Sequence, residues 1–451
     1  MHWSSTRWRV VLLKLLVWAS FLSACATPPT PEPLPTSVPP VRPLVLWHAW
    51  PASDQRTLAM LIEQYNQTSA VPIVLRAVPA ATFATELQDA LLVGNAPDVI
   101  LVQSHTLGAL ADTSLIQPIT AAHWSPAERE DMLPTVLASA LVTGTLAMSA
   151  TIAERPTDPA APINDPDPAQ LYGVPISFDT LGLYYHRAQA GTTPQSMAQV
   201  LAIAETLAQT DSEPPTWGMA YTLSLDKTLP YLSATGGAVF APDGTVVLAA
   251  SGRPGTEFWL EWLLALSRQP GVLATSDSIV IDSTLRSQSA WITIDWAHTL
   301  PRYHSLWGEQ LEVAVLPPIE PAGLPPRPFV QSMVLALPKQ AQPVPADQVA
   351  ALITYLHSPA VQTTLLEHGY QPVRASLPLL GDTIQIRAAR SFRAQTATAL
   401  PMPTSRFENE VVRGELQRML AAVLRGVIAP SDAITRADQM IREQQGQTTQ
   451  P

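Results

Sequence analysis

Proline is the residue that most restricts what this chain can fold into. The sequence contains 45 prolines among its 451 residues, so about one residue in ten has no backbone N–H to donate and interrupts a helix or strand interior. Frequent interruption of this kind argues against a coiled coil, a repeat solenoid and a polytopic membrane protein.

Composition narrows the class of protein further. Hydrophobic residues make up 47% of the chain and charged residues 14%, which is enough apolar material for a core and too much for an intrinsically disordered protein. The length predicts two or three domains at roughly 150 residues each. Lys and Arg number 26 against 37 Asp and Glu, a net charge of −11, so no nucleic-acid partner is expected.

Residues 1–24 have the pattern of a secretory signal peptide. The first 14 residues contain three basic side chains and no acidic one, and Leu15–Leu22 is an apolar run far shorter than the roughly 20 residues of a membrane span. The next residues, Leu22-Ser23-Ala24-Cys25, resemble the lipobox of bacterial lipoproteins, whose cysteine is linked to diacylglycerol and becomes the new, acylated N-terminus. Cys25 is the only cysteine, so it cannot form an internal disulfide. The alternative is an ordinary signal peptide followed by an incidental free thiol.

Residues 25–43 are expected to be a lipidated cysteine and a tether. Eight prolines stand between Ala26 and Pro43, which favours an extended polyproline II chain of roughly 3.1 Å per residue. Two or three acyl chains on Cys25 would hold the protein firmly to a membrane. We therefore predict a lipid anchor on the extracytoplasmic face of the cell membrane.

An alternation of strand and helix patterns begins at Leu44. Leu44–Trp47 has the pattern of a short buried strand, and a helix is predicted from Ser53-Asp54 by apolar residues at helical spacing, which are Leu58, Leu61, Ile62 and Tyr65. A strand at 71–78, a helix at 81–93 and a strand at 98–102 follow. This order predicts an α/β fold with a doubly wound parallel sheet, in which ligands bind beyond the carboxyl ends of the strands, here residues 47–50 and 103–105.

The second half of the chain is predicted to be α/β with a helix-rich end. Residues 148–170 are polar and rich in proline, which indicates a surface loop near a domain boundary. Apolar spacing predicts helices around 349–356 and 412–423, and Ser358-Pro359 predicts the start of another helix that ends near Gly369.

Short motifs are spread from about residue 44 to 440. They are Leu46-Trp47-His48-Ala49-Trp50, Asn95-Ala96-Pro97-Asp98-Val99, Tyr172-Gly173-Val174-Pro175-Ile176-Ser177, Leu183-Tyr184-Tyr185-His186-Arg187, Gly236-Gly237, the segment from Trp291 to Trp296, Leu316-Pro317-Pro318, the segment from Tyr355 to Gln362, and Leu424-Arg425-Gly426 with Ser431-Asp432-Ala433. Their order, together with the lipobox, resembles the extracellular solute-binding proteins of ABC importers, in the sugar-binding branch that includes the maltose-binding type. That family usually has a glycine-containing turn before the second tryptophan, whereas Asp295 directly precedes Trp296 here, so the local pocket shape is expected to differ.

The resemblance implies a two-lobed fold of the type II periplasmic-binding-protein kind, with hinge segments between two α/β lobes. It also implies lobes that are discontinuous in sequence. The expected division is residues 44–150 in lobe 1, 151–290 in lobe 2, 291–345 as a return to lobe 1 and hinge, 346–445 as the helical C-terminal part of lobe 2, and 446–451 as a disordered tail.

The resemblance further implies capture of a solute, most simply a mono- or oligosaccharide, and its delivery to the permease subunits of an ABC transporter. Binding would favour the closed form, because a ligand contacts both lobes only when they are closed. No bond is made or broken in such a cycle, so we expect no catalytic residues. We also expect no cofactor, no metal and a monomeric protein.

Candidate ligand-binding residues follow from the chemistry of a sugar, which offers hydroxyls to polar side chains and C–H faces to aromatic rings. Trp50, just past the first strand, and Trp296, at a predicted strand exit, are the expected stacking residues, although tryptophan more often lies in a core. The other candidates are polar or small residues near predicted strand ends, namely Gln103, Ser104, Asp179, Tyr221, Gly237 beside Gly236, and Asp295. Asp98 is expected to be a turn or capping residue.

Other functions remain open. Tyr184-Tyr185 resembles the paired tyrosines of ferric-ion-binding relatives, but consecutive strand residues point to opposite faces. A glycerol phosphate would need arginines or helix N-termini, and a polyamine would need several carboxylates with aromatic rings. A sensor or scaffold lipoprotein would have the same fold. An enzyme is the rival class, but the sequence has no G-x-S-x-G, P-loop, G-x-G-x-x-G or HExxH motif, and a glycosidase would need two facing carboxylates.

Overall fold

The structure, a computed structural model, describes residues 42–51, 55–142, 148, 170–209, 211–213, 215–320, 323–340 and 342–448. The expected signal peptide, Cys25, nearly all of the tether, the helix start at Ser53-Asp54 and most of the expected loop at 148–170 lie outside these residues. Within the described part of the chain, no helix combines the length and apolar character needed to cross a membrane.

Two parallel crossovers build the start of the first lobe. Its parallel strands are β1 (Leu44–His48), β2 (Ile73–Ala77) and β3 (Val99–Gln103), with β1 in the middle. The connecting helices are α2 (Gln55–Thr68) and α3 (Phe83–Leu92). The buried side of α2 includes the residues whose spacing predicted it, Leu58, Leu61, Ile62 and Tyr65. The predicted alternation is therefore confirmed.

A long strand, β13 (Phe329–Pro338), extends this sheet. It pairs antiparallel with β3 and with β7 (Gly173–Asp179), and short strands β4 (Ile116–Gln117) and β14 (Leu400–Pro401) pair with its two ends. Among the described residues these seven strands form one sheet, which with its helices we call the first lobe.

The helices α14 (Ala346–Leu356) and α15 (Pro359–Glu367) belong to the first lobe. Their apolar residues Val349, Leu352 and Leu365 lie in the same core as the parallel strands. The sequence division had placed 346–445 in the second lobe, and the structure differs here because helical spacing defines a buried face without defining which sheet covers it. The predicted cap is present, since the Ser358 hydroxyl accepts a hydrogen bond from the Val361 N–H.

The remaining described elements of the first lobe are short. They are a 3₁₀ turn η1 (Ser104–Thr106), helices α4 (Leu107–Asp112), α5 (Pro126–Glu130) and α6 (Pro134–Ala138), and a two-strand ladder of β5 (Leu141–Val142) and β6 (Gln170–Leu171).

The second lobe is built on another sheet. Its strands, in spatial order, are β10 (Val272–Thr275), β9 (Trp217–Thr222), β11 (Ala290–Trp296), β8 (Leu181–His186) and β12 (Leu311–Ala314). β9 is parallel to both β10 and β11, and β8 runs antiparallel to β11 and β12. The expected return to lobe 1 at residue 291 therefore differs from the structure, because β11 and β12 pair within the second sheet and the chain rejoins the first sheet with β13.

Both faces of the second sheet are covered. Along β8, Leu183 and Tyr185 enter one core and Tyr184 enters another, as the two-residue period of a strand requires. The helices α8 (Met197–Leu207) and α11 (Arg253–Leu266) share the core of Leu183. The helices α12 (Ser278–Arg286), α13 (Leu300–Trp307) and α16 (Ile384–Gln395) share the core of Tyr184, which is continuous with that of the first lobe.

Short elements complete the second lobe. They are α7 (Arg187–Ala190), α9 (Leu225–Thr228) and α10 (Pro230–Ala234), with 3₁₀ turns η3 (Ala297–Thr299) and η4 (Gly308–Gln310).

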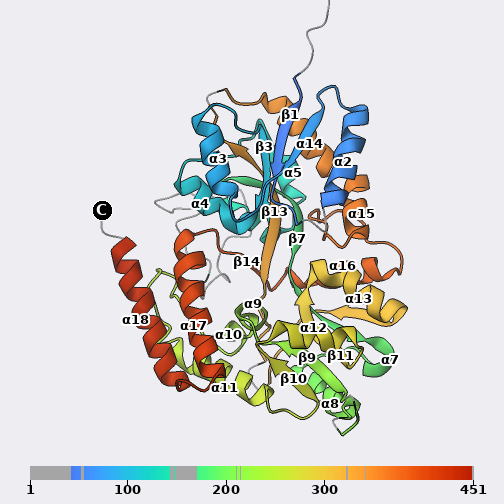
Figure 1. The fold of residues 1–451 in the computed structure, drawn as a ribbon, viewed down its shortest axis with the longest axis vertical. Coiled ribbons are helices and arrows are strands. Elements are labelled where there is room, and N and C mark those ends of the chain that lie inside the picture. Colours follow the sequence, from blue (N-terminus) through green and yellow to red (C-terminus); the bar gives the residue numbers. More distant parts are fainter. Residues whose placement is uncertain are drawn as a thin grey trace, which may run out of the picture. The chain divides into compact units, whose positions relative to one another are not determined.

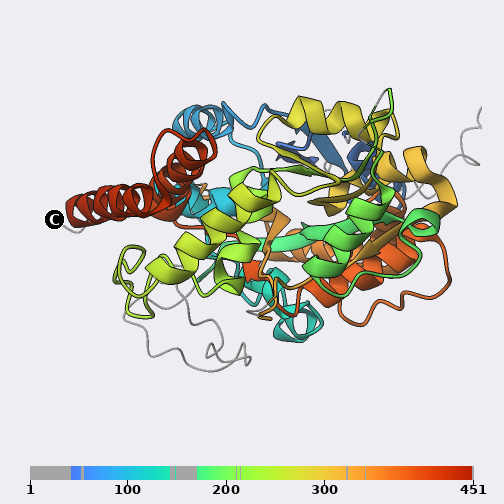
Figure 2. The same cartoon turned by 90° about the horizontal axis from the view of Figure 1, so that it is seen from below.

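The chain ends in a helix pair on the second lobe. A π-helical turn, η5 (Phe407–Val412), leads into α17 (Arg413–Leu424), and α18 (Pro430–Thr448) packs back against it. Figure 2 shows the two helices side by side at one end of this lobe. α17 ends at the predicted place, where Gly426 has a positive φ of 67°. α18 continues to Thr448, three residues into the expected tail.

Strands β7 and β13 connect the lobes. β7 ends at Asp179 and the chain enters β8 of the second sheet after the single residue Thr180, while β13 begins at Phe329 in the second-lobe core and continues through the first sheet (Figure 1). The Thr180 hydroxyl donates to the Phe329 carbonyl at 3.0 Å, which ties these two crossing points together.

Candidate ligand-binding site between the lobes

The carboxyl ends of the parallel strands of both lobes lie next to β7 and β13, the two strands that connect the lobes and that we call the crossing strands. Beyond β3, the Ser104 hydroxyl accepts a hydrogen bond from the backbone N–H of Ser332 in β13, at 3.1 Å. Beyond β11, the Ala297 N–H donates to the Thr180 carbonyl at 2.9 Å. Open α/β sheets bind ligands beyond these strand ends, so the two sheets place their ligand-facing ends at one region.

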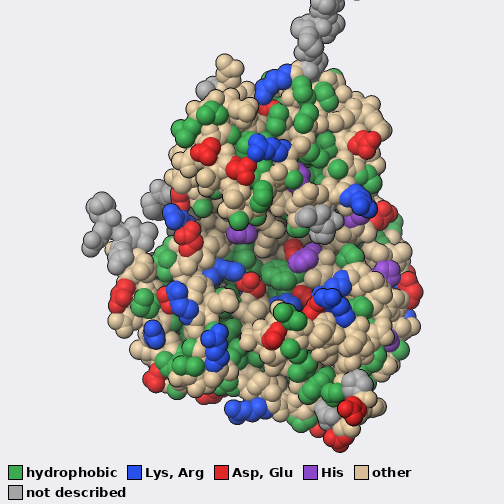
Figure 3. Space-filling view, in the orientation of Figure 1, with side chains coloured by type: hydrophobic (Ala, Val, Ile, Leu, Met, Phe, Trp, Pro, Cys, Tyr) green, Lys and Arg blue, Asp and Glu red, His purple; other side chains and the backbone are tan. Residues whose placement is uncertain are grey.

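Figure 3 shows a hollow in one face of the molecule, between the two lobes. Hydrophobic, histidine, acidic and basic side chains lie close together in it. Such a mixture of apolar and polar groups is typical of a small-molecule site.

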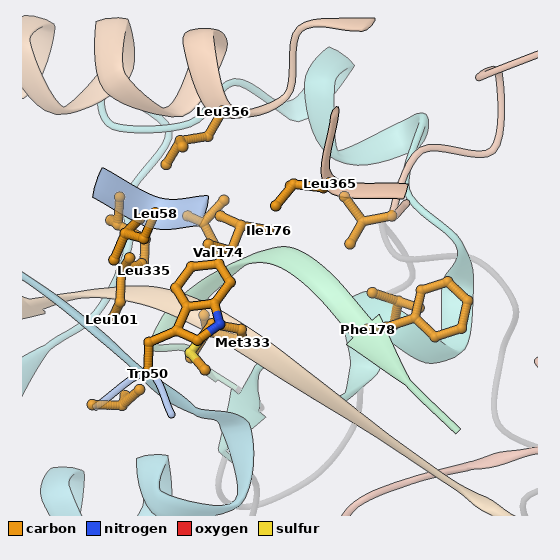
Figure 4. Packing of buried hydrophobic residues seen from close by; sticks show 14 of the residues in the cluster. Trp50, Leu58, Leu101, Val174, Ile176, Phe178, Met333, Leu335, Leu356 and Leu365 are labelled. Carbon is orange, nitrogen blue, oxygen red and sulfur yellow. The ribbon is translucent and has the colours of Figure 1, made fainter. Parts of the chain in front are cut away.

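Trp50 lies in the core of the first lobe and is 3% exposed. Its ring meets the edge of the Tyr370 ring with centroids 5.0 Å apart, and its Nε1–H donates to the Tyr370 hydroxyl at 2.5 Å. Figure 4 shows the indole projecting into the buried group that includes Val174 and Met333. The predicted stacking face is thus covered by protein in this structure.

Tyr370 is a residue that the sequence analysis missed. It follows the predicted helix end at Gly369, whose φ of 91° suits glycine. A Cβ at Gly369 would lie 2.8 Å from Cγ of Pro301, so glycine also permits close contact with α13 of the second lobe. The signal in the sequence was an aromatic residue after a helix-ending glycine, but its partner Trp50 lies 320 positions away.

Asp179 lies at the end of β7, at the crossing point between the lobes. Its carboxylate accepts the backbone N–H of His298 at 3.1 Å and is 2.6 Å from the His298 Nδ1 atom. Asp179 therefore joins the hinge to the turn that follows β11.

Gln103 and Ser104 stand at the end of β3 as predicted, but they differ in exposure. Ser104 is fully buried and its hydroxyl is used by Ser332, while the Gln103 side chain is half-buried. The next residue, His105, has its backbone carbonyl bonded to the Asn409 amide at 3.1 Å. Among the described residues, no hydrogen-bond partner reaches Nδ1 of its ring.

The second lobe contributes two ion pairs through the short helix α9. Lys227 Nζ lies 2.8 Å from Oδ1 of Asp295, and Oδ1 of Asp226 lies 2.7 Å from a terminal guanidinium nitrogen of Arg413. Asp295 also accepts the Tyr303 hydroxyl at 2.8 Å. Burial, and then the Asp295 charge, raise the pKa of Tyr303, so it remains a donor.

Tyr221 is fully buried and holds the backbone of α9 through a hydrogen bond. Its hydroxyl donates to the Lys227 carbonyl at 2.5 Å, and burial raises its pKa well above the usual value. The structure therefore places Tyr221 behind α9.

Gly237 lies in a turn that packs against α11. Its N–H donates to the Leu232 carbonyl at 2.9 Å, and a Cβ at Gly255 would lie 2.1 Å from the Gly237 nitrogen. The close backbone approach at Gly237 is therefore to another part of the protein.

Trp296 is the half-buried aromatic residue at the end of β11. Its carbonyl accepts the Tyr184 hydroxyl at 2.8 Å and the Thr299 hydroxyl at 2.6 Å, which fixes the backbone, while the ring packs partly against the second-lobe core. Trp296 is therefore more exposed than Trp50.

The tyrosine pair of the ferric-ion alternative is divided between the two faces of β8. Tyr184 is fully buried and bonded to Trp296, whereas the Tyr185 hydroxyl lies 2.7 Å from that of Thr193 on the other face. The two hydroxyls thus do not converge.

Asp98 has a structural role, since its Oδ2 accepts the N–H of Val45 in β1 at 2.7 Å.

Comparison with known proteins identifies the family. Residues 60–391, well over half of the chain, match the family described as bacterial extracellular solute-binding protein. No curated protein matches the sequence.

Solved structures of similar fold cover 89–91% of this chain. A cyclo/maltodextrin-binding protein complexed with maltotetraose is 18% identical, with 89% of this chain and 97% of that chain covered and a TM-score of 0.71. The extracellular solute-binding protein from Staphylococcus aureus in complex with maltose is 16% identical, with 91% and 99% covered and a TM-score of 0.69. The maltose/maltodextrin-binding domain MalE from Bdellovibrio bacteriovorus bound to maltotriose is 17% identical, with 89% and 99% covered and a TM-score of 0.67.

These likenesses confirm the predicted two-lobed α/β fold. The family is one of extracellular binding proteins, in agreement with the function class and the extracytoplasmic location expected from the sequence. The chain belongs to the bacterial extracellular solute-binding protein family.

Proposed function

We propose that this protein is the lipid-anchored binding subunit of an ABC importer and that it captures a neutral mono- or oligosaccharide between its lobes. The observation that carries the proposal is the convergence of strand ends from both sheets on shared crossing strands, with the half-buried Trp296 at the end of β11 directly after the ion-paired Asp295. The similar proteins bound to maltose, maltotriose and maltotetraose support a sugar as the ligand.

The binding residues have complementary roles in this proposal. The Trp296 ring offers a face to the C–H groups of a sugar, and Gln103 in the first lobe offers an amide to its hydroxyls. The ion-paired side chains of Lys227 and Asp295 in the second lobe offer a further donor and acceptor. A ligand that contacts both lobes stabilises the closed arrangement, which a permease can distinguish from the open one.

The arrangement of charges favours a neutral ligand over the other ligands considered. A polyamine needs carboxylates that are available to its amines, but Asp226 and Asp295 are each paired with a basic side chain. The basic side chains Lys227 and Arg413, which a phosphate would need, are engaged in the same pairs.

A thermal-shift screen tests the proposal. The mature chain carrying Cys25→Ser is heated with maltose, maltotriose, glycerol 3-phosphate, spermidine or ferric ion. A ligand at 100 times its dissociation constant stabilises the protein by about 2.7 kcal/mol, so a sugar that binds raises the melting temperature. A response to phosphate, polyamine or iron alone would replace the sugar, and no response to any ligand would favour a sensor or scaffold.

The proposed lipid anchor is tested separately. Cys25 lies outside the described residues, and the lipobox together with the proline-rich tether supports its lipidation. Cys25→Ser should move the protein from the membrane fraction to the soluble fraction of expressing cells. Retention of the variant in membranes would contradict lipidation at this residue.

A further inference from the structure

Four charged side chains of the second lobe form two ion pairs that are joined through α9, and we call this set the charge-paired wall. They are Asp226 and Lys227 of α9, Arg413 at the start of α17, and Asp295 of β11. Adjacent residues of one short helix thus carry opposite charges, and each charge is matched by a partner from a different element. The net charge of the wall is zero.

The two pairs differ in how far they reach solvent. The side chains of Lys227 and Asp295 are 16% and 9% exposed, whereas those of Arg413 and Asp226 are 19% and 37% exposed. Asp226 is therefore the most exposed member of the wall, and the pair it forms with Arg413 is the more exposed of the two.

The wall is held in place by hydrogen bonds to its backbone. The Tyr221 hydroxyl bonds the carbonyl of Lys227, and the buried Trp259 donates its Nε1–H to the carbonyl of Thr228 at 3.0 Å. The Thr228 hydroxyl in turn donates to the Ser224 carbonyl at 2.8 Å. Since α9 is anchored at both of its last residues, its backbone is fixed relative to β9 and α11.

The imidazole of His105 in the first lobe lies close enough to this wall for the charges of Arg413 and Asp226 to affect its pKa. Burial, and then the charge of Arg413, lower the pKa of His105, while Asp226 acts in the opposite direction. The imidazole is therefore neutral at pH 7, and it adds a polar group without adding charge to the site.

We propose that the charge-paired wall makes the site selective for uncharged solutes, with Asp226 and Arg413 as the residues that set this selectivity. The inference rests on the proposed function, since it concerns the same site. A charged ligand group loses its hydration when it enters the site. Beside an ion pair whose charges already cancel, it meets no free opposite charge that would offset this cost of desolvation. Removal of one member of the outer pair leaves its partner unmatched, and that partner attracts a ligand of the opposite charge.

Calorimetric titration of three matched ligands tests this inference. The ligands are maltose and two analogues in which one ring is glucuronate or glucosamine, so that size is constant and charge varies. The wild-type protein should prefer maltose at least tenfold over both. Asp226→Asn should shift the ratio at least tenfold towards the glucuronate analogue, and Arg413→Gln should shift it by a similar factor towards the glucosamine analogue.

Two further variants control the experiment. Arg418→Gln removes an exposed charge on α17 that pairs with Glu415 and with no member of the wall, and it should leave the preferences of the wild type unchanged. The exchange of charges in Asp226→Arg with Arg413→Asp restores neutrality and should restore the preference for maltose, which separates charge from a loss of folding.

The outcomes distinguish the inference from the proposed function. Binding of maltose by the wild type with unchanged ratios in Asp226→Asn and Arg413→Gln would overturn the inference and leave the proposed function in place. A wild type that prefers either charged analogue would overturn the inference as well. A wild type that binds none of the three sugars would overturn both.

Discussion

The two lobes contribute different chemistry to the proposed site. The first lobe offers uncharged groups, namely the half-buried Gln103, the neutral His105 and the covered pair of Trp50 and Tyr370. The second lobe offers two ion pairs and the half-buried Trp296. Near the crossing strands, then, the first lobe presents mainly uncharged groups, whereas the second lobe presents paired charges and a half-buried aromatic residue.

The largest expected effect is at Trp50. Trp50→Ala removes a buried indole from the first-lobe core and should lower the free energy of unfolding by about 3–5 kcal/mol. Urea denaturation of the variant and the wild type, both without ligand, measures this difference. A variant as stable as the wild type would contradict the core role of Trp50 and return it to the list of accessible aromatic residues.

The next largest effect is at Asp295 in the second lobe. Asp295→Ala leaves Lys227 and the Tyr303 hydroxyl without their partner and should destabilise the protein by about 3 kcal/mol. The control is Glu410→Ala, which breaks an exposed pair with Arg406 and should change stability by less than about 1 kcal/mol. Equal losses in the two variants would mean that the Asp295 pair has no special energetic role.

Acid should weaken the first lobe through His357. This side chain lies in the core with its Nε2 atom 2.8 Å from the Pro175 carbonyl, and burial lowers its pKa. The native imidazole stays neutral while the unfolded one takes up a proton below about pH 6.5, so stability is complete above that pH and falls as the pH is lowered.

The slope of that loss is at most about 1.4 kcal/mol per pH unit for one proton. Urea denaturation between pH 7 and pH 5 should give a shallower loss for His357→Gln than for the wild type. The same dependence on pH in both proteins would show that other groups determine the acid response.

The smallest effect concerns ligand affinity and not folding. Trp296→Ala should weaken sugar binding at least tenfold, about 1.4 kcal/mol, with a much smaller change in the melting temperature of the empty protein than Trp50→Ala causes. Calorimetry measures the affinity. An unaltered dissociation constant would remove Trp296 from the site and with it the contrast between the two tryptophans.

Local patterns in the sequence predicted the elements and several strand ends. The spacing of Leu58, Leu61, Ile62 and Tyr65 predicted α2, and Ser358-Pro359 predicted the start of α15. Gln103 and Ser104 were expected at a ligand-facing strand end; Gln103 is the last residue of β3 and Ser104 follows it. These features depend on neighbouring residues, whose relative positions follow from the geometry of a helix or strand.

Burial of individual candidates could not be predicted in the same way. Tyr221 and Gly237 were placed among the ligand-binding candidates, but one supports α9 from behind and the other packs against α11. The local sequence around a residue at a strand end does not show whether a ligand or a distant part of the chain covers that residue. Tyr370 covers Trp50 in this way from 320 positions away.

The sequence by itself determined the α/β alternation of residues 44–103, the order of family motifs and the polar and aromatic residues at the strand ends. Only the tertiary structure decided that α14 and α15 join the first lobe, that β11 and β12 stay in the second, and that Asp226 and Lys227 find their partners in Arg413 and Asp295. The reason is physical. Periodicity defines which face of an element is buried, but its partner is chosen by packing and charge pairing between segments far apart in the chain, which no local pattern encodes.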